Sequence, residues 1–217
     1  MINNDIFKSS RPLIAILRGI TPLEAESVSE VLIESGINII EVPLNSPKPF
    51  ETIARMVEFH GDKGIFGAGT VLTEDEVLKV ADVGGKIIVS PNSNPSIIKK
   101  TKELNLYSFP GVFTPTECFQ ALDAGADALK FFPASLLKAK NFKAISSVLP
   151  KNIISIAVGG INENKFKNLP SFNILQKPKH DLENFLAAST IAFQLGIKIE
   201  KISKSINSFL GIRRWFE

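Results

Sequence analysis

The sequence predicts an α/β protein, a (β/α)8 TIM barrel whose single domain spans residues 1–217. Short apolar runs rich in β-branched and aromatic residues alternate with longer amphipathic stretches, which is typical of strand–helix units around a parallel sheet. Seven such units are visible, at about 20 to 25 residues each, and this exceeds what most doubly wound sheets hold. The strands also lack a Gly-x-Gly-x-x-Gly turn. We therefore expect a barrel, with an altered or inserted eighth unit.

The units can be placed one after another along the chain. The predicted strands cover 13–17, 38–42, 64–67, 86–89, 106–109, 128–132 and 153–158. The predicted helices cover 21–35, 47–59, 73–83, 94–104, 114–124 and 137–148. Thr21 and Thr73 are the expected N-caps, because Glu24 and Glu76 follow at capping-box spacing. Gly36 is expected to end the first helix.

The eighth unit is the least regular. Two strand candidates, 172–175 and 191–195, are separated by a polar, lysine-rich stretch that contains Pro178. We favour 191–195 as the strand that closes the barrel. A last helix is predicted over 200–210, where apolar residues recur at helical spacing.

Composition excludes several classes of protein. The chain has 25 Lys and Arg against 22 Asp and Glu, and no run of like charges that could follow a nucleic-acid backbone. The single cysteine, Cys118, is expected in the core, and neither His60 nor His180 belongs to a cluster with metal-ligand spacing, so no metal is predicted. No signal peptide is recognisable, and no apolar run approaches the roughly 18 residues that span a bilayer. We expect a soluble, cytoplasmic protein that contacts neither nucleic acid nor membrane.

Three charged residues lie in or just after strands that should otherwise be apolar. Glu41 shares strand parity with Ile39, Lys130 shares it with Ala128, and Arg18 continues the alternation of the first strand. All three are expected to project inward near the carboxyl ends of their strands, where barrel enzymes hold their chemistry. A self-satisfied buried ion pair, or charges that reach solvent, is the alternative. A desolvated Lys130 would be an amine nucleophile suited to Schiff-base formation, with Glu41 moving protons.

Glycine-rich loops follow two of the strands. Gly67-Ala68-Gly69-Thr70 and Val158-Gly159-Gly160 would let the backbone approach a small anion closely. Ser90-Pro91-Asn92 would shape the rim of the same site. Simple turn geometry is the alternative explanation for each of these segments.

These motifs together resemble the Schiff-base aldolases that cleave 2-keto-3-deoxy-6-phospho sugar acids. The similarity covers about residues 12–160 and rests on the segments LIAILRGITP at 13–22, IEVPLNSP at 40–47, GAGTVL at 67–72, ALKFFP at 128–133 and AVGG at 157–160. Within that family, the PLNSP and VGG segments look like the branch that acts on 2-dehydro-3-deoxy-6-phosphogalactonate.

The resemblance implies a reaction and its catalytic residues. Lys130 would form the Schiff base with the C2 keto group, and Glu41 would be the general acid and base. The products would be pyruvate and glyceraldehyde 3-phosphate, and no metal or other cofactor would be needed. The resemblance also implies a homotrimer.

The resemblance implies binding residues as well. Arg18 and Thr70 would hold the pyruvyl carboxylate, which a guanidinium can bind in a bidentate manner. Pro91 and Phe132 would line the pocket.

The sequence departs from the family's pattern after Gly160. The family holds phosphate between the glycines that match Gly159 and Gly160 and a Gly-x-Gly-Ser loop after strand eight. Here that loop reads Gln194-Leu195-Gly196-Ile197, and 170–185 looks like an insertion. Gly196 is therefore the remaining candidate from that loop. The alternatives are an aldolase for the phosphogluconate epimer, 4-hydroxy-2-ketoglutarate or an unphosphorylated keto acid, and a degenerate barrel without catalysis.

Overall fold

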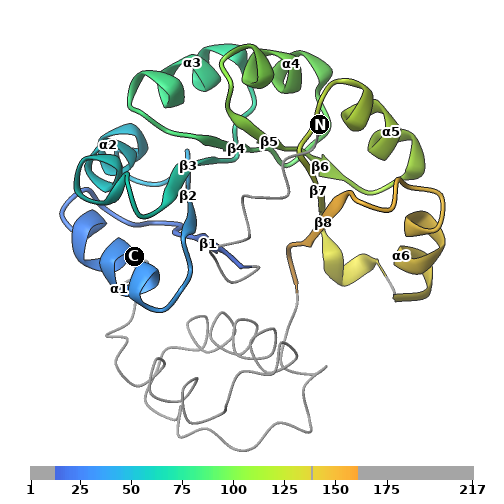
Figure 1. Ribbon diagram of the computed structural model, residues 1–217, viewed down its shortest axis with the longest axis horizontal. Helices are drawn as coiled ribbons and strands as arrows, with labels where there is room; N and C mark the ends of the chain where they lie inside the picture. Colours follow the sequence, from blue (N-terminus) through green and yellow to red (C-terminus); the bar gives the residue numbers. More distant parts are fainter. Residues whose placement is uncertain (1–12, 138, 161–217) are drawn as a thin grey trace, which may run out of the picture. The chain divides into compact units, whose positions relative to one another are not determined.

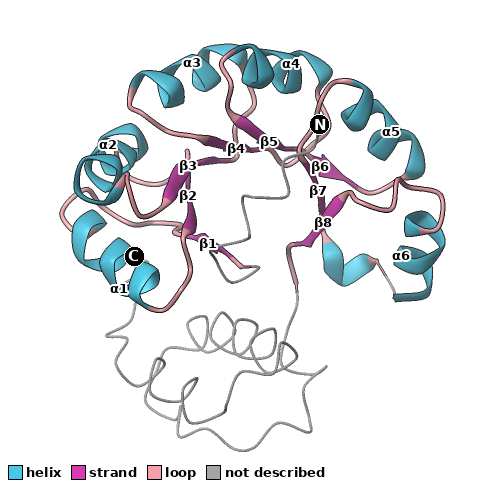
Figure 2. Ribbon diagram, viewed as in Figure 1, coloured by secondary structure: helices cyan, strands magenta, loops and turns pink. Residues whose placement is uncertain are grey.

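Strands and helices alternate along the chain in the computed structural model, which describes residues 13–137 and 139–160 (Figure 2). The strands are β1 (Ile14–Ile16), β2 (Ile39–Pro43), β3 (Ile65–Gly69), β4 (Ile87–Val89), β5 (Tyr107–Phe109), β6 (Gly111–Val112), β7 (Ala128–Phe131) and β8 (Ile154–Ala157). The helices are α1 (Ala25–Glu34), α2 (Pro49–His60), α3 (Glu74–Asp82), α4 (Pro95–Glu103), α5 (Pro115–Asp123), the 3₁₀ helix η2 (Ala134–Leu136) and α6 (Ala139–Ser146). Each strand predicted between 13 and 158 is present, and β6 is an addition.

The strands form parallel sheets in the order expected for a barrel. One sheet has the order β1-β2-β3-β4-β5 and the other the order β6-β7-β8. The break falls at Pro110, which has no N–H to donate. Hydrogen bonds cross the break, because the Asp127 N–H donates to Ser108 O at 3.0 Å and the Lys130 N–H donates to Pro110 O at 2.9 Å. The predicted fifth strand therefore continues beyond Pro110 as β6.

Apolar side chains pack on both sides of the strands, as a TIM barrel requires. Figure 1 shows α1 to α6 along the outer side of the strands. Between the strands and the helices lie two clusters, one centred on β2 to β4 and the other on β7. A third cluster fills the inner side and contains Ile39, Ile87, Val89, Phe109 and Ala128. We call this third cluster the inner cluster.

Two helices begin with the capping box that their sequences encode. In α3 the Thr73 hydroxyl accepts from the Glu76 N–H and the Glu76 carboxylate accepts from the Thr73 N–H, as predicted. Thr114 and Glu117 repeat the arrangement in α5. The buried Cys118 of α5 is fully enclosed in the core, also as predicted.

The first helix begins later than its sequence predicts. Thr21 is not its N-cap, because α1 starts at Ala25 and the Thr21 hydroxyl donates to the Glu24 carboxylate at 2.7 Å instead of accepting from the helix. The residues between form a tighter turn, in which the Glu24 N–H donates to Thr21 O. Gly36 ends the helix as expected, with a φ of 80° that favours glycine.

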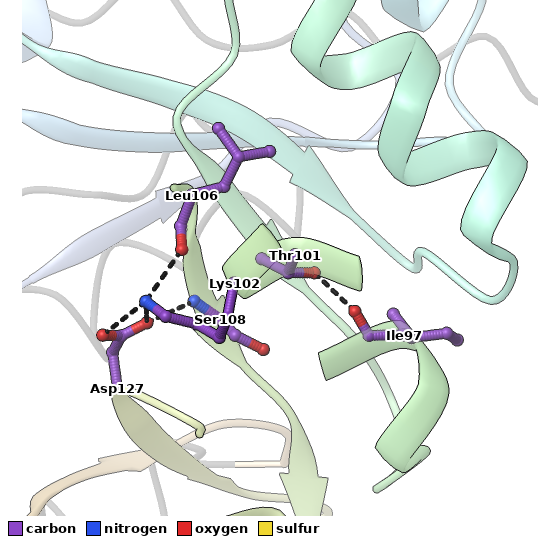
Figure 3. Close-up of polar contacts among 6 residues, drawn as sticks. All are labelled: Ile97, Thr101, Lys102, Leu106, Ser108 and Asp127. Carbon is purple, nitrogen blue, oxygen red and sulfur yellow. Dashed lines mark hydrogen bonds and ion pairs between the residues drawn. The ribbon is translucent and has the colours of Figure 1, made fainter. Parts of the chain in front are cut away.

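A polar cluster joins α4 to the amino-terminal ends of β5 and β7 (Figure 3). Lys102 Nζ donates to the two carboxylate oxygens of Asp127 at 2.9 and 2.7 Å and to Leu106 O at 3.0 Å. Asp127 also accepts from the Ser108 N–H at 2.8 Å. This cluster holds a helix against the start of two strands. In a TIM barrel this amino-terminal end of the strands contributes to stability, and the opposite end holds the chemistry.

The eighth unit and the prediction of a single domain are not tested by these residues. The chain divides into two compact units, Met1–Gly159 and Gly160–Glu217. The predicted strand at 191–195, its alternative at 172–175 and the helix at 200–210 lie outside the described residues. Among the helices that the structure describes, none is both long and apolar enough to cross a membrane.

Candidate active site

Glu41 lies at the centre of β2 with its side chain on the inner side of the sheet. It is 3% exposed and has the same parity as Ile39, a member of the inner cluster. Glu41 pairs with Gly67, yet a Cβ built on Gly69 would collide with its carboxylate. The Glu41 side chain therefore points from Gly67 toward Gly69, that is, toward the carboxyl end of the strands. Its Oε2 atom is buried and has no hydrogen-bond partner among the described residues.

Lys130 lies near the carboxyl end of β7, also on the inner side. It shares parity with Ala128 of the inner cluster, whereas Leu129 and Phe131 pack outward beneath the helices. Only 8% of Lys130 is exposed. Its Nζ atom lies 5.0 Å from the centroid of the Phe132 ring. The amine is thus largely removed from solvent and lies near the Phe132 ring.

Burial opposes the charge on both residues. Desolvation raises the pKa of Glu41 from 4.5 to about 7, against the lowering influence of Lys130 and Arg18. Desolvation likewise lowers the pKa of Lys130, with the positive charge of Arg18 adding to the effect and Glu41 opposing it. A carboxyl group that titrates near neutral pH can both accept and donate protons. A lysine of lowered pKa offers a larger share of the free amine, which is its nucleophilic form.

Arg18 lies in the loop after β1 and contributes a third charge to this end of the strands. Its side chain is exposed, and its Nη1 atom donates to Asn45 Oδ1 at 2.8 Å. Its charge acts on the pKa of both Glu41 and Lys130. The guanidinium is therefore a cation at the mouth of the site, suited to a carboxylate.

Thr70 follows β3 directly and has an unusual backbone conformation. Its φ is 60°, in the left-handed region where a β-branched residue is a genuine outlier. Such strain persists only where the surrounding structure determines it, and it is concentrated at functional sites. Thr70 directly follows Gly69, the residue against which the Glu41 carboxylate lies, so the strained turn is beside that carboxylate.

The other predicted site residues lie in loops after β4, β7 and β8. A Cβ on Gly111 would collide with Pro91 O, so the Pro91 loop lies against the start of β6. A Cβ on Gly159 would lie 3.0 Å from two ring carbons of Phe132, so the glycine leaves room for that ring. Gly160 is exposed, with a φ of 67°. Gly196 lies outside the described residues.

The structure adds residues for which no role was predicted. The Gly19 N–H, in the loop after β1, donates to Ser46 Oγ at 3.0 Å. Asn45 and Ser46 belong to the PLNSP segment after β2, whose side chains were not predicted to take part in the site. Ser46 is 7% exposed, and no pattern in the sequence signals that burial.

Metal ligands are not gathered in this part of the chain. Within 13–137 and 139–160, no group of three or more His, Cys, Asp or Glu side chains could hold a metal ion. His60 is the last residue of α2, and its Nε2 atom lies 3.3 Å from Glu26 O. The prediction that no metal is used stays a prediction, and His180 lies outside the described residues.

Comparison with known proteins identifies relatives over most of the chain. Residues 4–175 match the model of the family "KDPG and KHG aldolase". A protein of Rhizobium meliloti named "Probable 2-dehydro-3-deoxy-6-phosphogalactonate aldolase" is 49% identical over 76% of this chain and 77% of its own length. The 2-dehydro-3-deoxy-6-phosphogalactonate aldolase of Escherichia coli is 43% identical over 71% and 76%, respectively.

A solved structure supports the same relationship in three dimensions. The structure described as "Native KDPGal structure" superimposes with a TM-score of 0.72 at 36% identity, over 92% of this chain and 93% of that one. The family match covers well over half of the sequence, and it agrees with the parallel β/α architecture. The chain belongs to the KDPG and KHG aldolase family.

Proposed function

We propose that this protein is a Schiff-base aldolase that cleaves 2-dehydro-3-deoxy-6-phosphogalactonate to pyruvate and glyceraldehyde 3-phosphate. The observation that carries the proposal is a buried amine and a buried carboxyl group on the inner side of one barrel, each with its pKa moved toward neutrality. The two relatives reported above, whose names specify this substrate, support the choice of substrate.

The proposed reaction begins at the amine. Unprotonated Lys130 Nζ adds to the C2 carbonyl carbon, and the resulting carbinolamine loses water to give an iminium ion. Glu41, whose pKa burial raises to about 7, gives a proton to the departing hydroxyl and afterwards, as a carboxylate, accepts the proton of the C4 hydroxyl. The C3–C4 bond then breaks. Its electron pair moves to the iminium nitrogen, which leaves an enamine and releases the aldehyde.

The second half of the reaction returns the enzyme to its starting state. Protonation of the enamine at C3, with Glu41 as the acid, restores an iminium ion. Addition of water at C2 then frees pyruvate and the Lys130 amine. No electrons leave the substrate, so an oxidant is not required.

The carboxylate of the substrate is assigned to Arg18 and Thr70. Arg18 supplies a planar donor at the mouth of the site, and Thr70 supplies a hydroxyl beside Gly69. Pro91 and Phe132 line the pocket around the amine in this proposal. The ring of Phe132 is 5.0 Å from Nζ and excludes water from one side of it.

The phosphate of the substrate is assigned to the glycines of the strand ends. Gly159 and Gly160 both have positive φ values, which turn the backbone after β8. Gly196 is the candidate from the last loop. The segment predicted to form that loop reads Gln194-Leu195-Gly196-Ile197 and lacks a serine. This observation favours, as second candidates, an aldolase for the phosphogluconate epimer, 4-hydroxy-2-ketoglutarate or an unphosphorylated keto acid.

We also propose a homotrimer located in the cytoplasm, on the resemblance described above. Light scattering coupled to gel filtration would give a mass three times 23.7 kDa. A monomer over the whole working concentration range would contradict the trimer.

Borohydride trapping tests the proposed chemistry without requiring the right sugar. The purified protein is incubated with pyruvate and sodium borohydride, followed by intact-mass measurement and peptide mapping. We expect one reduced pyruvyl adduct, on Lys130. The matched controls are Lys130→Met, which should give no adduct, and Lys143→Met, which removes an exposed lysine of α6 and should leave the adduct unchanged. A folded wild-type protein without an adduct would contradict the proposal in favour of the degenerate barrel.

Comparison of substrates then decides between the aldolases. Release of pyruvate from the phosphogalactonate compound should be at least tenfold more efficient, in kcat/KM, than from the phosphogluconate epimer, since about tenfold corresponds to the net free energy of one hydrogen bond. A higher kcat/KM with an unphosphorylated keto acid would mean that the preferred substrate carries no phosphate, in agreement with the altered sequence at 194–197.

A further inference from the structure

Two hydrogen bonds connect the loop after β1 to the PLNSP segment after β2. Arg18 Nη1 donates to Asn45 Oδ1 at 2.8 Å, and the Gly19 N–H donates to Ser46 Oγ at 3.0 Å. Consecutive residues of one loop are thus bound to consecutive residues of the other, 27 positions along the chain. One bond holds the backbone just after Arg18, and the other holds the tip of its side chain.

The backbone bond depends on the conformation of Gly19. With a φ of 84°, Gly19 occupies a region that other residues rarely adopt. Its N–H donates to a hydroxyl that is itself buried, since Ser46 is 7% exposed. The turn is thereby tied to the end of β2, three residues beyond Pro43. This bond fixes where the Arg18 side chain starts.

The side-chain bond leaves the charge of Arg18 intact. Asn45 offers a neutral amide oxygen, whereas an aspartate in its place would offer a carboxylate that neutralises the guanidinium. Arginine has five N–H donors, and Asn45 uses one of them. Among residues 13–137 and 139–160 the remaining donors bind no other side chain or backbone group, so they and the positive charge are available to an anion from solution.

The same charge also acts on the two buried residues of the site. Arg18 lowers the pKa of Glu41 and of Lys130, although it is exposed and belongs to neither strand. A long, exposed arginine would otherwise move among many rotamers, at a cost in free energy when a ligand fixes it. An acceptor that holds the guanidinium in advance reduces that cost.

We propose that Asn45 and Ser46 are positioning residues that hold Arg18, with its charge uncompensated, to receive the carboxylate of the keto acid. The inference rests on the proposed function, since it takes the anion to be that carboxylate. Asn45 acts through Arg18 and contacts no reacting atom. Ser46 acts one step earlier, through the Gly19 backbone.

Pyruvate trapping by borohydride provides the first test, with the pyruvate concentration varied. Asn45→Ala should raise the half-saturating concentration about fivefold, the size expected for loss of an exposed hydrogen bond to a charged group. The adduct yield at saturation should not change, because Lys130 and Glu41 remain in place. Asn141→Ala, an exposed substitution on α6, is the matched control and should trap as the wild type does.

Two further variants separate positioning from a general structural role. In an Arg18→Met background, Asn45→Ala should have no additional effect, since the residue through which Asn45 acts is gone. Asn45→Asp should also raise the half-saturating pyruvate concentration at pH 7. This increase should become smaller as the pH falls and the new carboxylate is protonated. An unchanged half-saturation in Asn45→Ala, or an equal effect with and without Arg18, would overturn the inference.

The side-chain Nε–H signal of Arg18 in a ¹H–¹⁵N NMR spectrum tests the contact itself, without pyruvate. Assigned by its absence in Arg18→Lys, the signal should shift and lose order in Asn45→Ala and stay unchanged in Asn141→Ala. If the wild type traps no pyruvate but this signal responds, the proposed function fails and the contact survives. If the wild type traps pyruvate and the signal does not respond, the positioning role fails alone.

Discussion

Lys102 and Lys130 each interact with a carboxylate, but the two pairs lie at opposite ends of the strands. At the amino-terminal end, Lys102 Nζ donates three hydrogen bonds, and Asp127 accepts a further one from the Ser108 N–H. Toward the carboxyl end, Glu41 is more deeply buried, yet its Oε2 atom has no hydrogen-bond partner in the part of the chain that the structure describes. The more buried pair is therefore the less satisfied one.

The two pairs differ in what their burial indicates: full hydrogen bonding indicates a stabilising role, and a buried group without a partner indicates a role in chemistry. A buried charge without partners costs free energy, and folding alone gives no reason to keep one where apolar residues would fit. The cost is reflected in the pKa of Glu41, which rises to about 7, and in the lowered pKa of Lys130. The satisfied pair holds α4 to β5 and β7, whereas the unsatisfied pair is the one that we propose reacts with the substrate.

The largest expected effect comes from removing the lysine of the unsatisfied pair. Lys130→Met should reduce kcat/KM by at least a thousandfold, because the covalent route is lost. At pH 5, where Glu41 keeps its proton, the free energy of unfolding in urea should stay close to that of the wild type, since the apolar side chain then leaves no buried charge without its partner. A folded Lys130→Met enzyme with activity within tenfold of the wild type would remove Lys130 from the mechanism.

A methyl group placed against the carboxylate should have the next largest effect. In Gly69→Ala the new Cβ would collide with the Glu41 carboxylate, which must then move. We expect kcat/KM to fall about a hundredfold, as for other small displacements of a catalytic group. Glu41→Asp in the Gly69→Ala background shortens the acid and should restore the stability lost to the collision, though not the activity. Activity within threefold of the wild type in Gly69→Ala would show that the position of the carboxylate is not critical.

The unsatisfied carboxyl group should also make stability depend on pH. Its pKa is raised on folding, so the folded state keeps a proton that the unfolded chain releases above pH 4.5. The Glu41 contribution is therefore complete below pH 4.5 and is lost as the pH rises to about 7. Relative to Glu41→Gln, the wild type should lose about 3 kcal/mol of unfolding free energy across that interval. Urea titrations of both proteins at pH 4.5, 5.5, 7 and 8 would measure it.

Lys130→Met provides a control for that pH dependence. Lys130 lowers the pKa of Glu41, so without it the pH dependence should extend above pH 7. Parallel pH profiles of the wild type and Glu41→Gln would mean that folding leaves the pKa of Glu41 at its ordinary value of 4.5.

The sequence predicted the strands and the two buried charges well, because both depend on local periodicity. Alternation along β2 and β7 is enough to place Glu41 with Ile39 and Lys130 with Ala128. The start of α1 was predicted wrongly, since the same Thr21 and Glu24 side chains can form a bond without capping a helix. The continuation of the fifth strand past Pro110 depends on hydrogen bonds to the next strand, which no local pattern contains.

The contacts between loops were beyond sequence reasoning for a similar reason. Arg18 and Asn45 are 27 residues apart, and only the parallel pairing of β1 with β2 brings their loops together. The collision between a Cβ at position 69 and the Glu41 carboxylate likewise depends on the direction of a side chain from the neighbouring strand. Residue types indicated the chemistry, whereas the register of the sheet determined which residues support it.

The smallest expected effect comes from the satisfied pair. Lys102→Met keeps the aliphatic stem but removes three hydrogen bonds, and it leaves Asp127 with the Ser108 N–H alone among the contacts in Figure 3. The two side chains are 34% and 16% exposed, so water replaces part of the loss, and we expect about 2 kcal/mol less unfolding free energy. Activity per folded molecule should stay within twofold of the wild type, the reverse of Lys130→Met. The double variant Lys102→Met/Asp127→Asn should recover part of the stability, because the remaining side chain is uncharged. A loss of activity without a loss of stability in Lys102→Met would contradict the division of the two pairs into one that stabilises the fold and one that serves chemistry.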